Sequence, residues 1–167
     1  SSSAASDVYK RQQVDSAIQN LDTVSVNINY SNMSKSVLDQ KFNLNISDEM
    51  LSAMSDLFIS LSGTELKADQ VNLYDFSGYV LQAGLSTMVK KSDDSHNEWI
   101  QKAREANGKK VLTAPYSTYV YSKSARYPQW FISLYRSFTN QYGRGVGVIE
   151  TAKQCKSIFK SIISYEK

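Results

Sequence analysis

Apolar residues recur at helical spacing near the start of the chain. Five of them follow one another at three- or four-residue steps, with polar residues between them: Val14, Ile18, Leu21, Val24 and Ile28. This period is typical of a helix that buries one face. We predict one helix from Gln13 to about Leu38. A helix of that length either packs along its own domain or pairs with a second copy of itself.

A second helical pattern covers residues 45–63. Ser47 is a suitable N-cap, and Asp48 and Glu49 favour the positive end of the helix. Gly63 suits the C-terminal stop. The apolar residues between these ends fall on one face: Met50, Leu51, Met54, Leu57, Phe58 and Leu61. Methionines on such a face indicate core packing rather than a cofactor site.

The middle of the chain predicts a β-hairpin. Val71 and Leu73 belong to its first strand, and the apolar run Tyr79–Leu81 belongs to its second strand. The intervening segment, "DFSG", has the composition of a turn, because Gly78 accepts a positive φ without a steric penalty. The polar residues 86–99 that follow are expected to form a loop.

A short helix comes next. Residues 95–110 predict this helix, with Trp99, Ile100 and Ala103 directed inward and Gly108 as its terminator. Beyond it the pattern changes from helical to extended.

Strands dominate the last third of the chain. Val111 and Leu112 form a short strand, and residues 130–138 alternate between the two faces of a longer one. One face carries Trp130, Ile132, Leu134, Arg136 and Phe138, and the other carries Phe131, Ser133, Tyr135 and Ser137. We predict a turn at residues 139–145, a returning strand at 146–151 and a closing helix at 151–165.

Helices and strands in this order predict the α+β class. They favour one mixed or antiparallel sheet of about five strands, with the long helix and the shorter helices beside it. The chain divides into the long helix with its connection, residues 13–45, and a sheet module, residues 46–167. Residues 1–12, "SSSAASDVYKRQ", have no apolar period and resemble a translated adaptor sequence. We therefore expect residues 1–12 to be non-native and exclude them from the predicted fold.

Composition and charge narrow the classes of function. The chain has 167 residues, of which 41% are hydrophobic, enough for one domain with a core. Its net charge of +3 comes from 19 basic and 16 acidic residues spread along the chain. That charge is too small and too scattered to predict a nucleic-acid partner. No apolar run approaches the ~20 residues needed to cross a bilayer, and no signal peptide is recognisable.

No group of residues has the spacing of a catalytic or metal site. One histidine, His96, and one cysteine, Cys155, can form neither a disulfide nor a zinc site. Asp93 and Asp94 are adjacent in a polar stretch and indicate a solvated loop rather than a general acid–base pair. The glycines of residues 143–148 lie in a turn and its returning strand, which disfavours a nucleotide site. The sequence offers no case for an enzyme, a cofactor or a metal.

Residues 113–138 are rich in aromatic rings and contain no acidic residue. The rings are Tyr116, Tyr119, Tyr121, Tyr127, Trp130, Phe131, Tyr135 and Phe138. Tyrosine joins an apolar ring to a hydroxyl that needs a partner, so these rings favour a pocket for a small polar molecule. The alternative is that Phe131, Tyr135 and Phe138 pack against helices while Tyr119, Tyr121 and Tyr127 lie at the surface. A nucleic-acid platform would need basic residues along its length, and only Lys123, Arg126 and Arg136 are near.

Four segments together resemble a Cache domain, the extracellular PAS-like sensor module of bacterial receptors. They read "NLDTVSVNINYSNM", "NLYDFSGYVL", "EWIQKAREANGKKVLTAPY" and "FISLYRSFTNQYGRGVGVIET", in that order. More narrowly, they resemble the sensor region of YesM-like sensor histidine kinases. The resemblance covers Gln13 to Lys167 and rests on the order and spacing of the segments.

The resemblance implies an antiparallel sheet with the long helix along one side, held outside the bacterial plasma membrane between two membrane spans. The chain would be the membrane-distal module of a double-Cache receptor, cut at both ends, that signals as a homodimer and binds a small molecule. The spans, the signalling linker and the kinase domains would lie outside it. A chemoreceptor, a cyclase sensor and a free-standing binding protein are alternatives with the same fold.

The resemblance also supplies candidate site residues. The amino-acid-binding members of the family carry Arg-x-Trp-Tyr and then Tyr-x-Asp, which match Asn97, Trp99 and Ile100, then Tyr116 and Thr118. Asn97 and Thr118 replace the two charged anchors, which favours a sugar or another neutral polar ligand over an amino acid. We expect a pocket between the sheet and the segment after the first hairpin. Its expected lining is Trp99, Tyr116, Tyr119, Tyr121 and Trp130, with Asn97, Thr118, Arg126 and Arg136 as polar partners.

Overall fold

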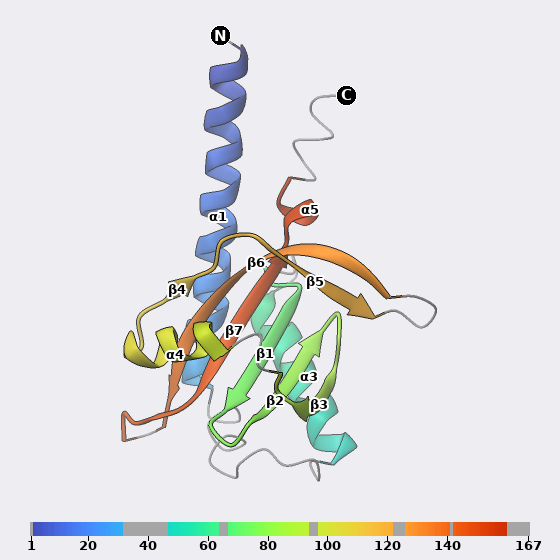
Figure 1. Cartoon of the computed structure of the whole chain (residues 1–167), viewed down its shortest axis with the longest axis vertical. Coiled ribbons are helices and arrows are strands. Elements are labelled where there is room, and N and C mark those ends of the chain that lie inside the picture. Colours follow the sequence, from blue (N-terminus) through green and yellow to red (C-terminus); the bar gives the residue numbers. More distant parts are fainter. Residues whose placement is uncertain are drawn as a thin grey trace.

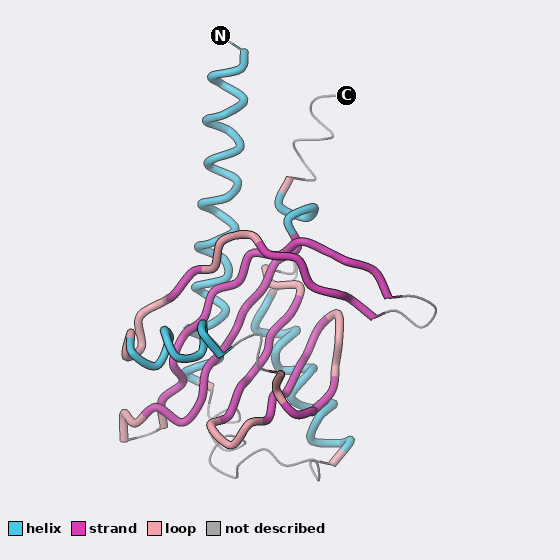
Figure 2. The backbone as a smooth tube through the Cα atoms, viewed as in Figure 1, coloured by secondary structure: helices cyan, strands magenta, loops and turns pink. Residues whose placement is uncertain are grey.

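An antiparallel sheet with helices on both faces forms the centre of the computed structural model (Figure 1, Figure 2). The structure describes residues 2–31, 47–63, 67–93, 97–121, 126–140 and 142–159. The strands are β1 (Gln70–Asp75), β2 (Tyr79–Gly84), β3 (Met88–Lys91), β4 (Val111–Leu112), β5 (Tyr116–Tyr121), β6 (Arg126–Thr139) and β7 (Gly145–Gln154). The helices are α1 (Ser2–Tyr30), α3 (Asp48–Ser62), α4 (Asn97–Glu105) and α5 (Cys155–Ile158).

The strands lie in the order β3-β2-β1-β7-β6-β4, and β5 also pairs with β6. All of these pairs are antiparallel. β7 is thus an interior strand, which accounts for its continuous run of buried residues from Gly147 to Ala152. The predicted α+β class is confirmed, and the described sheet has seven strands rather than about five.

The two faces of the sheet differ in character. On one face, α1 and α3 bury an apolar core that includes Leu21, Phe58, Leu73, Leu134 and Ile149. Successive residues of a strand point to opposite faces, so the next residues of β1 and β6, Tyr74 and Tyr135, pack on the other side against α4. α4 has only nine residues and covers part of that second face. The remainder of the second face holds the cavity described below.

α1 is one helix, but its bounds differ from those predicted. It begins at Ser2 rather than Gln13, and it ends at Tyr30 rather than near Leu38, which lies outside the described residues. Residues 3–12 are almost all exposed, so no apolar period could reveal this part of the helix. It projects beyond the sheet in Figure 1. No helix in the described part of the chain is both long and apolar enough to cross a membrane.

Several local predictions are confirmed. α3 begins directly after Ser47 and is followed by Gly63, whose φ is +79°. The predicted hairpin is β1 paired with β2, and Gly78 takes a φ of +98° in its turn. The Asp75 carboxylate closes this turn by accepting hydrogen bonds from the Tyr79 backbone N–H (2.8 Å) and the Ser77 backbone N–H (3.0 Å).

Two local predictions are wrong. The segment predicted as a loop contains β3, an edge strand whose polar residues include Lys90 and Lys91. Lysines on an edge strand discourage further pairing, so its polarity does not indicate a loop. The predicted closing helix starts too early, because Thr151–Gln154 continue β7 and only Cys155–Ile158 form α5. Pairing of β7 with β1 and β6 outweighs the local helical pattern there.

Candidate ligand-binding site

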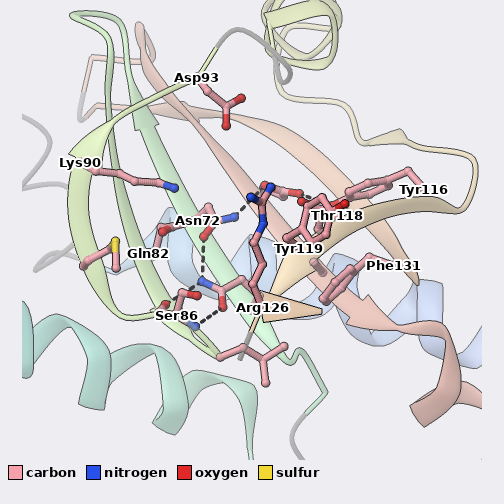
Figure 3. A pocket seen from close by; sticks show the side chains of 15 residues that line it. Asn72, Gln82, Ser86, Lys90, Asp93, Tyr116, Thr118, Tyr119, Arg126 and Phe131 are labelled. Atoms are coloured by element: carbon pink, nitrogen blue, oxygen red, sulfur yellow. Dashed lines mark hydrogen bonds between the residues drawn. The ribbon is translucent and has the colours of Figure 1, made fainter. Parts of the chain in front are cut away.

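A cavity of about 510 Å³ lies on the face of the sheet that α4 partly covers (Figure 3). Its lining comes from β1, β2, β5, β6 and β7 and from the segment after the first hairpin, which includes β3. Three amides, Gln70, Asn72 and Gln82, line it together with the hydroxyl residues Ser86 and Thr118. A volume of this size is in the range that accommodates small organic ligands.

Glu150 of β7 organises the sheet side of the cavity. Its side chain is 1% exposed, and four side chains donate to its carboxylate. Oε1 accepts from Asn72 Nδ2 (2.8 Å) and the Tyr74 hydroxyl (2.7 Å). Oε2 accepts from the Tyr116 hydroxyl (2.9 Å) and the Ser133 hydroxyl (2.7 Å). Four strands are thereby joined through one acidic side chain.

A chain of amide hydrogen bonds extends from Glu150 to the turn between β2 and β3. Asn72 Oδ1 accepts from Gln70 Nε2 at 2.9 Å, and the Gln70 amide pairs with both backbone groups of Ser86 at 3.0 Å. Gly84 permits this close turn, because a Cβ there would lie 2.3 Å from the Asp69 carbonyl oxygen. The polar lining is therefore held in place without a ligand.

Three tyrosines around Glu150 are held in the protonated form. Burial, with the nearby charge of Glu150, raises the pKa of Tyr74 and Tyr135 well above the usual tyrosine range. The same two causes raise the pKa of Tyr116. These side chains are neutral hydrogen-bond donors at physiological pH.

Charged side chains from two sides also line the cavity. Lys90 of β3 and Arg126 of β6 bring positive charge, and Asp93 brings negative charge. In Figure 3, the Lys90 and Arg126 side chains both extend into the cavity. The Arg126 guanidinium lies 3.8 Å from the ring centroid of Tyr119, a cation–π contact that orients the arginine.

Four of the nine predicted site residues line this cavity: Tyr116, Thr118, Tyr119 and Arg126. Tyr116 also stacks against Phe131, with ring centroids 6.2 Å apart. Asn97 and Trp99 lie on α4 instead, and the Trp99 ring packs against Tyr135 at 6.3 Å. The Trp99 ring thus belongs to the apolar cluster that α4 forms with Tyr74 and Tyr135, beside the cavity.

The other three predicted residues have separate positions. Trp130 lies on β6 with 58% of its surface exposed, and Tyr121 is the last residue of β5. Arg136 joins α1 to the turn after α4: it contacts Asp22 and donates to the Ser25 hydroxyl (3.1 Å) and the Gly108 carbonyl (2.6 Å). The alternation of side chains along β6 was predicted correctly. This alternation places Arg136 on the α1 side of the sheet, opposite the cavity.

Sequence reasoning missed most of the polar lining. Glu150, Asn72, Gln70, Gln82 and Lys90 were not among the candidates. One signal was present: Glu150 is an acidic residue within an otherwise apolar interior strand, "VGVIET". A second was the alternation of β1, which places Gln70, Asn72 and Tyr74 on one face. Neither signal shows that these side chains meet across different strands.

The described residues contain no group of three or more His, Cys, Asp or Glu side chains arranged to hold a metal ion. Within the described part of the chain, the arrangement is that of a polar, aromatic-walled cavity. Such a cavity can bind and orient a small molecule through hydrogen bonds and ring contacts.

Solved structures with the same architecture decide the type of fold. The extracellular domain of vpHK1S-Z8, a candidate histidine kinase, matches with a TM-score of 0.67 and 13% identity, covering 95% of this chain and 58% of that one. The chain has the same fold as these domains, as expected for a PAS-like α+β domain. No protein-family model and no curated protein sequence matches the chain.

Two further neighbours come from other kinds of protein. A sensory-box/GGDEF family protein of Vibrio parahaemolyticus has a TM-score of 0.67 and 12% identity, with 95% of this chain and 61% of that one covered. The amino-acid chemoreceptor PctC of Pseudomonas aeruginosa, bound to GABA, has a TM-score of 0.58 and 10% identity, with 93% and 61% covered. The chain thus spans about three fifths of the length of these neighbours.

Proposed function

We propose that this chain is the extracellular ligand-sensing domain of a transmembrane sensor histidine kinase. The observation that carries the proposal is the cavity of about 510 Å³, whose polar lining is held in place by Glu150 on a Cache-type fold. A binding event there would change contacts among β1, β3, β5 and β7, and α1 packs on the opposite face of the same sheet. The chain itself would perform no catalysis.

The ligand we propose is a small, hydroxyl-rich molecule such as a sugar. Support comes from the amides of Gln70, Asn72 and Gln82, which both donate and accept hydrogen bonds, and from the rings of Tyr116 and Tyr119. Thr118, which lines the cavity and stands where amino-acid-binding members of the Cache family have an aspartate, supports the same choice. An amino acid is the competing class, because the neighbour PctC was solved with GABA.

Two other outputs fit the same fold. A chemoreceptor and a GGDEF protein are among the structural neighbours, so a chemotaxis or cyclase output is the alternative to a kinase. The protein would lie on the extracellular face of a bacterial plasma membrane, anchored by flanking helices, and would act as a homodimer. The narrower assignment, a double-Cache YesM-like kinase, rests on the order of the sequence segments. Flanking coding sequence that specifies a membrane span and a kinase domain would support that assignment, and its absence there would contradict it.

The binding site can be tested with two aromatic residues of one hairpin. Thermal-shift screening against sugars, organic acids and amino acids would first find a ligand, and calorimetry would then measure its affinity. Tyr119→Ala removes a ring that lines the cavity and is 52% exposed. We expect it to weaken binding by about 1–3 kcal/mol, as for contact residues that a ligand buries when it binds. Trp130→Ala removes an exposed ring of β6 outside the cavity lining and serves as the matched control.

The two variants separate the possible outcomes. A loss of affinity confined to Tyr119→Ala supports the cavity as the binding site. If Tyr119→Ala binds as tightly as the original protein while Trp130→Ala loses affinity, the site is on the outer surface of the hairpin. If no compound in any class stabilises the protein, the proposed sensing function is wrong.

A further inference from the structure

Lys90 occupies an unusual position for a lysine of an edge strand. In the β2–β3 ladder, Lys90 pairs with Val80 and Lys91 pairs with Tyr79. Since Val80 is buried on the α4 side of the sheet, Lys90 points to that side, into the cavity (Figure 3). Lys90 is half-buried, whereas Lys91 is exposed. The neighbouring lysine therefore offers a built-in control.

No carboxylate of the described residues lies within ion-pair distance of the Lys90 ammonium. A second cation, Arg126, lines the same cavity and is oriented by its contact with Tyr119. An anion between a lysine and an arginine gains charge-assisted hydrogen bonds, which are shorter and stronger than neutral ones. A planar carboxylate also matches the fork of an arginine.

The acidic residues of the lining limit how much negative charge a ligand can carry. Glu150 is buried, and its oxygens already accept four hydrogen bonds. A ligand would therefore meet the side chains around Glu150 rather than its carboxylate oxygens. Asp93 is exposed and also lines the cavity. Two cations and two carboxylates leave the lining with no surplus of positive charge, which disfavours di- and tricarboxylates. A single carboxylate placed between the two cations still gains from both of them.

We infer that the ligand is a hydroxylated monocarboxylate, such as a sugar acid, whose carboxylate lies between Lys90 and Arg126. This inference rests on the proposed function and specifies the ligand class for the same cavity. The hydroxyls of the ligand meet the amides of Gln70, Asn72 and Gln82, and its ring or chain lies against the tyrosines. The polar lining that favours a sugar is retained, and the two cations add a requirement for an acid.

The test compares matched acids and neutral sugars by isothermal titration calorimetry. The probes are galacturonate with galactose, glucuronate with glucose, the dicarboxylate galactarate, and valine with GABA. We expect one uronate to bind about tenfold more tightly than its neutral sugar, which is about 1.4 kcal/mol. Its affinity should fall as salt is raised, since partly exposed charges are screened.

Two charge-removing variants then locate the carboxylate. Lys90→Gln and Arg126→Gln should each lower uronate affinity about tenfold, or about 1.4 kcal/mol, and should lower the affinity for the neutral sugar much less. Lys91→Gln and Arg144→Gln, at exposed positions outside the cavity lining, are the controls and should alter neither affinity. Thermal unfolding of each variant confirms that it folds.

The outcomes distinguish this inference from the proposed function. If neutral sugars bind as tightly as their acids, or Lys90→Gln weakens both equally, the acid requirement is wrong and the sensing function stands. Tightest binding by galactarate, valine or GABA also overturns the inference and retains a sensing function. If none of the probes binds, the inference fails, and the proposed function fails with it only if the broader thermal-shift screen also finds no ligand.

Discussion

A single carboxylate, that of Glu150, accepts hydrogen bonds from side chains on three other strands, β1, β5 and β6. Burying an ionised carboxylate is unfavourable unless its oxygens are fully hydrogen-bonded. Here each oxygen accepts from two of the named donors, and these four donors are neutral side chains. The charge that remains in this poorly solvated region acts on the nearby phenols, and this effect is measurable.

Alkaline pH should destabilise the protein through Tyr74, Tyr116 and Tyr135. The unfolded chain loses each phenol proton near the ordinary value of 10.0, whereas the folded state keeps it because each folded-state pKa is raised. Above pH 10 the folded state therefore binds more protons, and the free energy of unfolding falls as pH rises. Each such tyrosine contributes a slope of about 1.4 kcal/mol per pH unit. Below pH 10 this contribution to stability is fully present.

Urea unfolding between pH 9 and pH 12 would measure this slope. Tyr74→Phe should reduce the slope by about 1.4 kcal/mol per pH unit, whatever it does to stability at neutral pH. Tyr142→Phe, at a tyrosine that is 79% exposed, is the control and should leave the slope unchanged. Equal slopes for the original protein and Tyr74→Phe would show that Tyr74 ionises normally in the folded state.

The positions of single residues were predictable from sequence only where a local pattern or the resemblance pointed to them. Tyr116 and Thr118 were candidates from the resemblance and Tyr119 from ring density, and all three line the cavity. Trp99 matched the same family motif, yet its ring packs against Tyr135 beside the cavity. Glu150 acquires its role from partners as many as 78 residues away in the chain, and no local pattern encodes such a meeting.

At the scale of elements, periodicity predicted those segments that bury one face. α3, the β1–β2 hairpin and the alternation of β6 followed directly from it. β3 was missed because an edge strand bearing lysines needs no apolar alternation. The first part of α1 was missed for a related reason: it buries almost nothing, so helix propensity is its only local signal.

We propose that residues 1–12 add nothing to the folded domain, and this gives a prediction for α1. The first buried residue of α1 is Ala17, and residues 3–12 are almost all exposed. Deleting residues 1–12 should change the free energy of unfolding by less than about 1 kcal/mol, because a short exposed helical segment is only marginally stable in water. Urea denaturation of the shortened and full chains would measure the difference.

The control for this deletion is a buried position of the same helix. Leu21 is fully buried against the sheet, and Leu21→Ala should lower the free energy of unfolding by about 2–5 kcal/mol. If the deletion of residues 1–12 lowers the free energy of unfolding as much as Leu21→Ala does, the prediction is wrong. The segment would then make stabilising contacts with another molecule, such as a second copy of the chain.

At the scale of the whole molecule, the two faces of the sheet differ in what packs against them. The α1–α3 face is an apolar core, and the opposite face holds the cavity and the α4 cluster. Arg136 connects elements of the two faces: it contacts Asp22 and Ser25 of α1, and it donates to the Gly108 carbonyl in the turn after α4. A change of α4 or of the sheet on ligand binding would therefore reach α1, the helix that we expect to form the homodimer.

The homodimer should depend on anchoring of both copies in the membrane rather than on an apolar contact surface. The side of α1 that faces away from its core is polar and exposed, with Asp15, Ser16, Gln19, Thr23 and Asn27. Such a surface offers little apolar area to drive association, so the separate domain should sediment as a monomer. Anchoring two copies in a membrane raises their effective concentration and allows a weak contact to form.

Cysteine cross-linking would test this contact in the full-length receptor. In a Cys155→Ser background, Gln19→Cys and Asn27→Cys place thiols on the exposed side of α1, and Lys91→Cys places one on the distant edge strand β3. We expect disulfide-linked dimers for the two α1 positions and none for Lys91→Cys, because only a parallel pairing of α1 brings equivalent positions together. Cross-linking at Lys91 alone, or at none of the three positions, would contradict a dimer formed along α1.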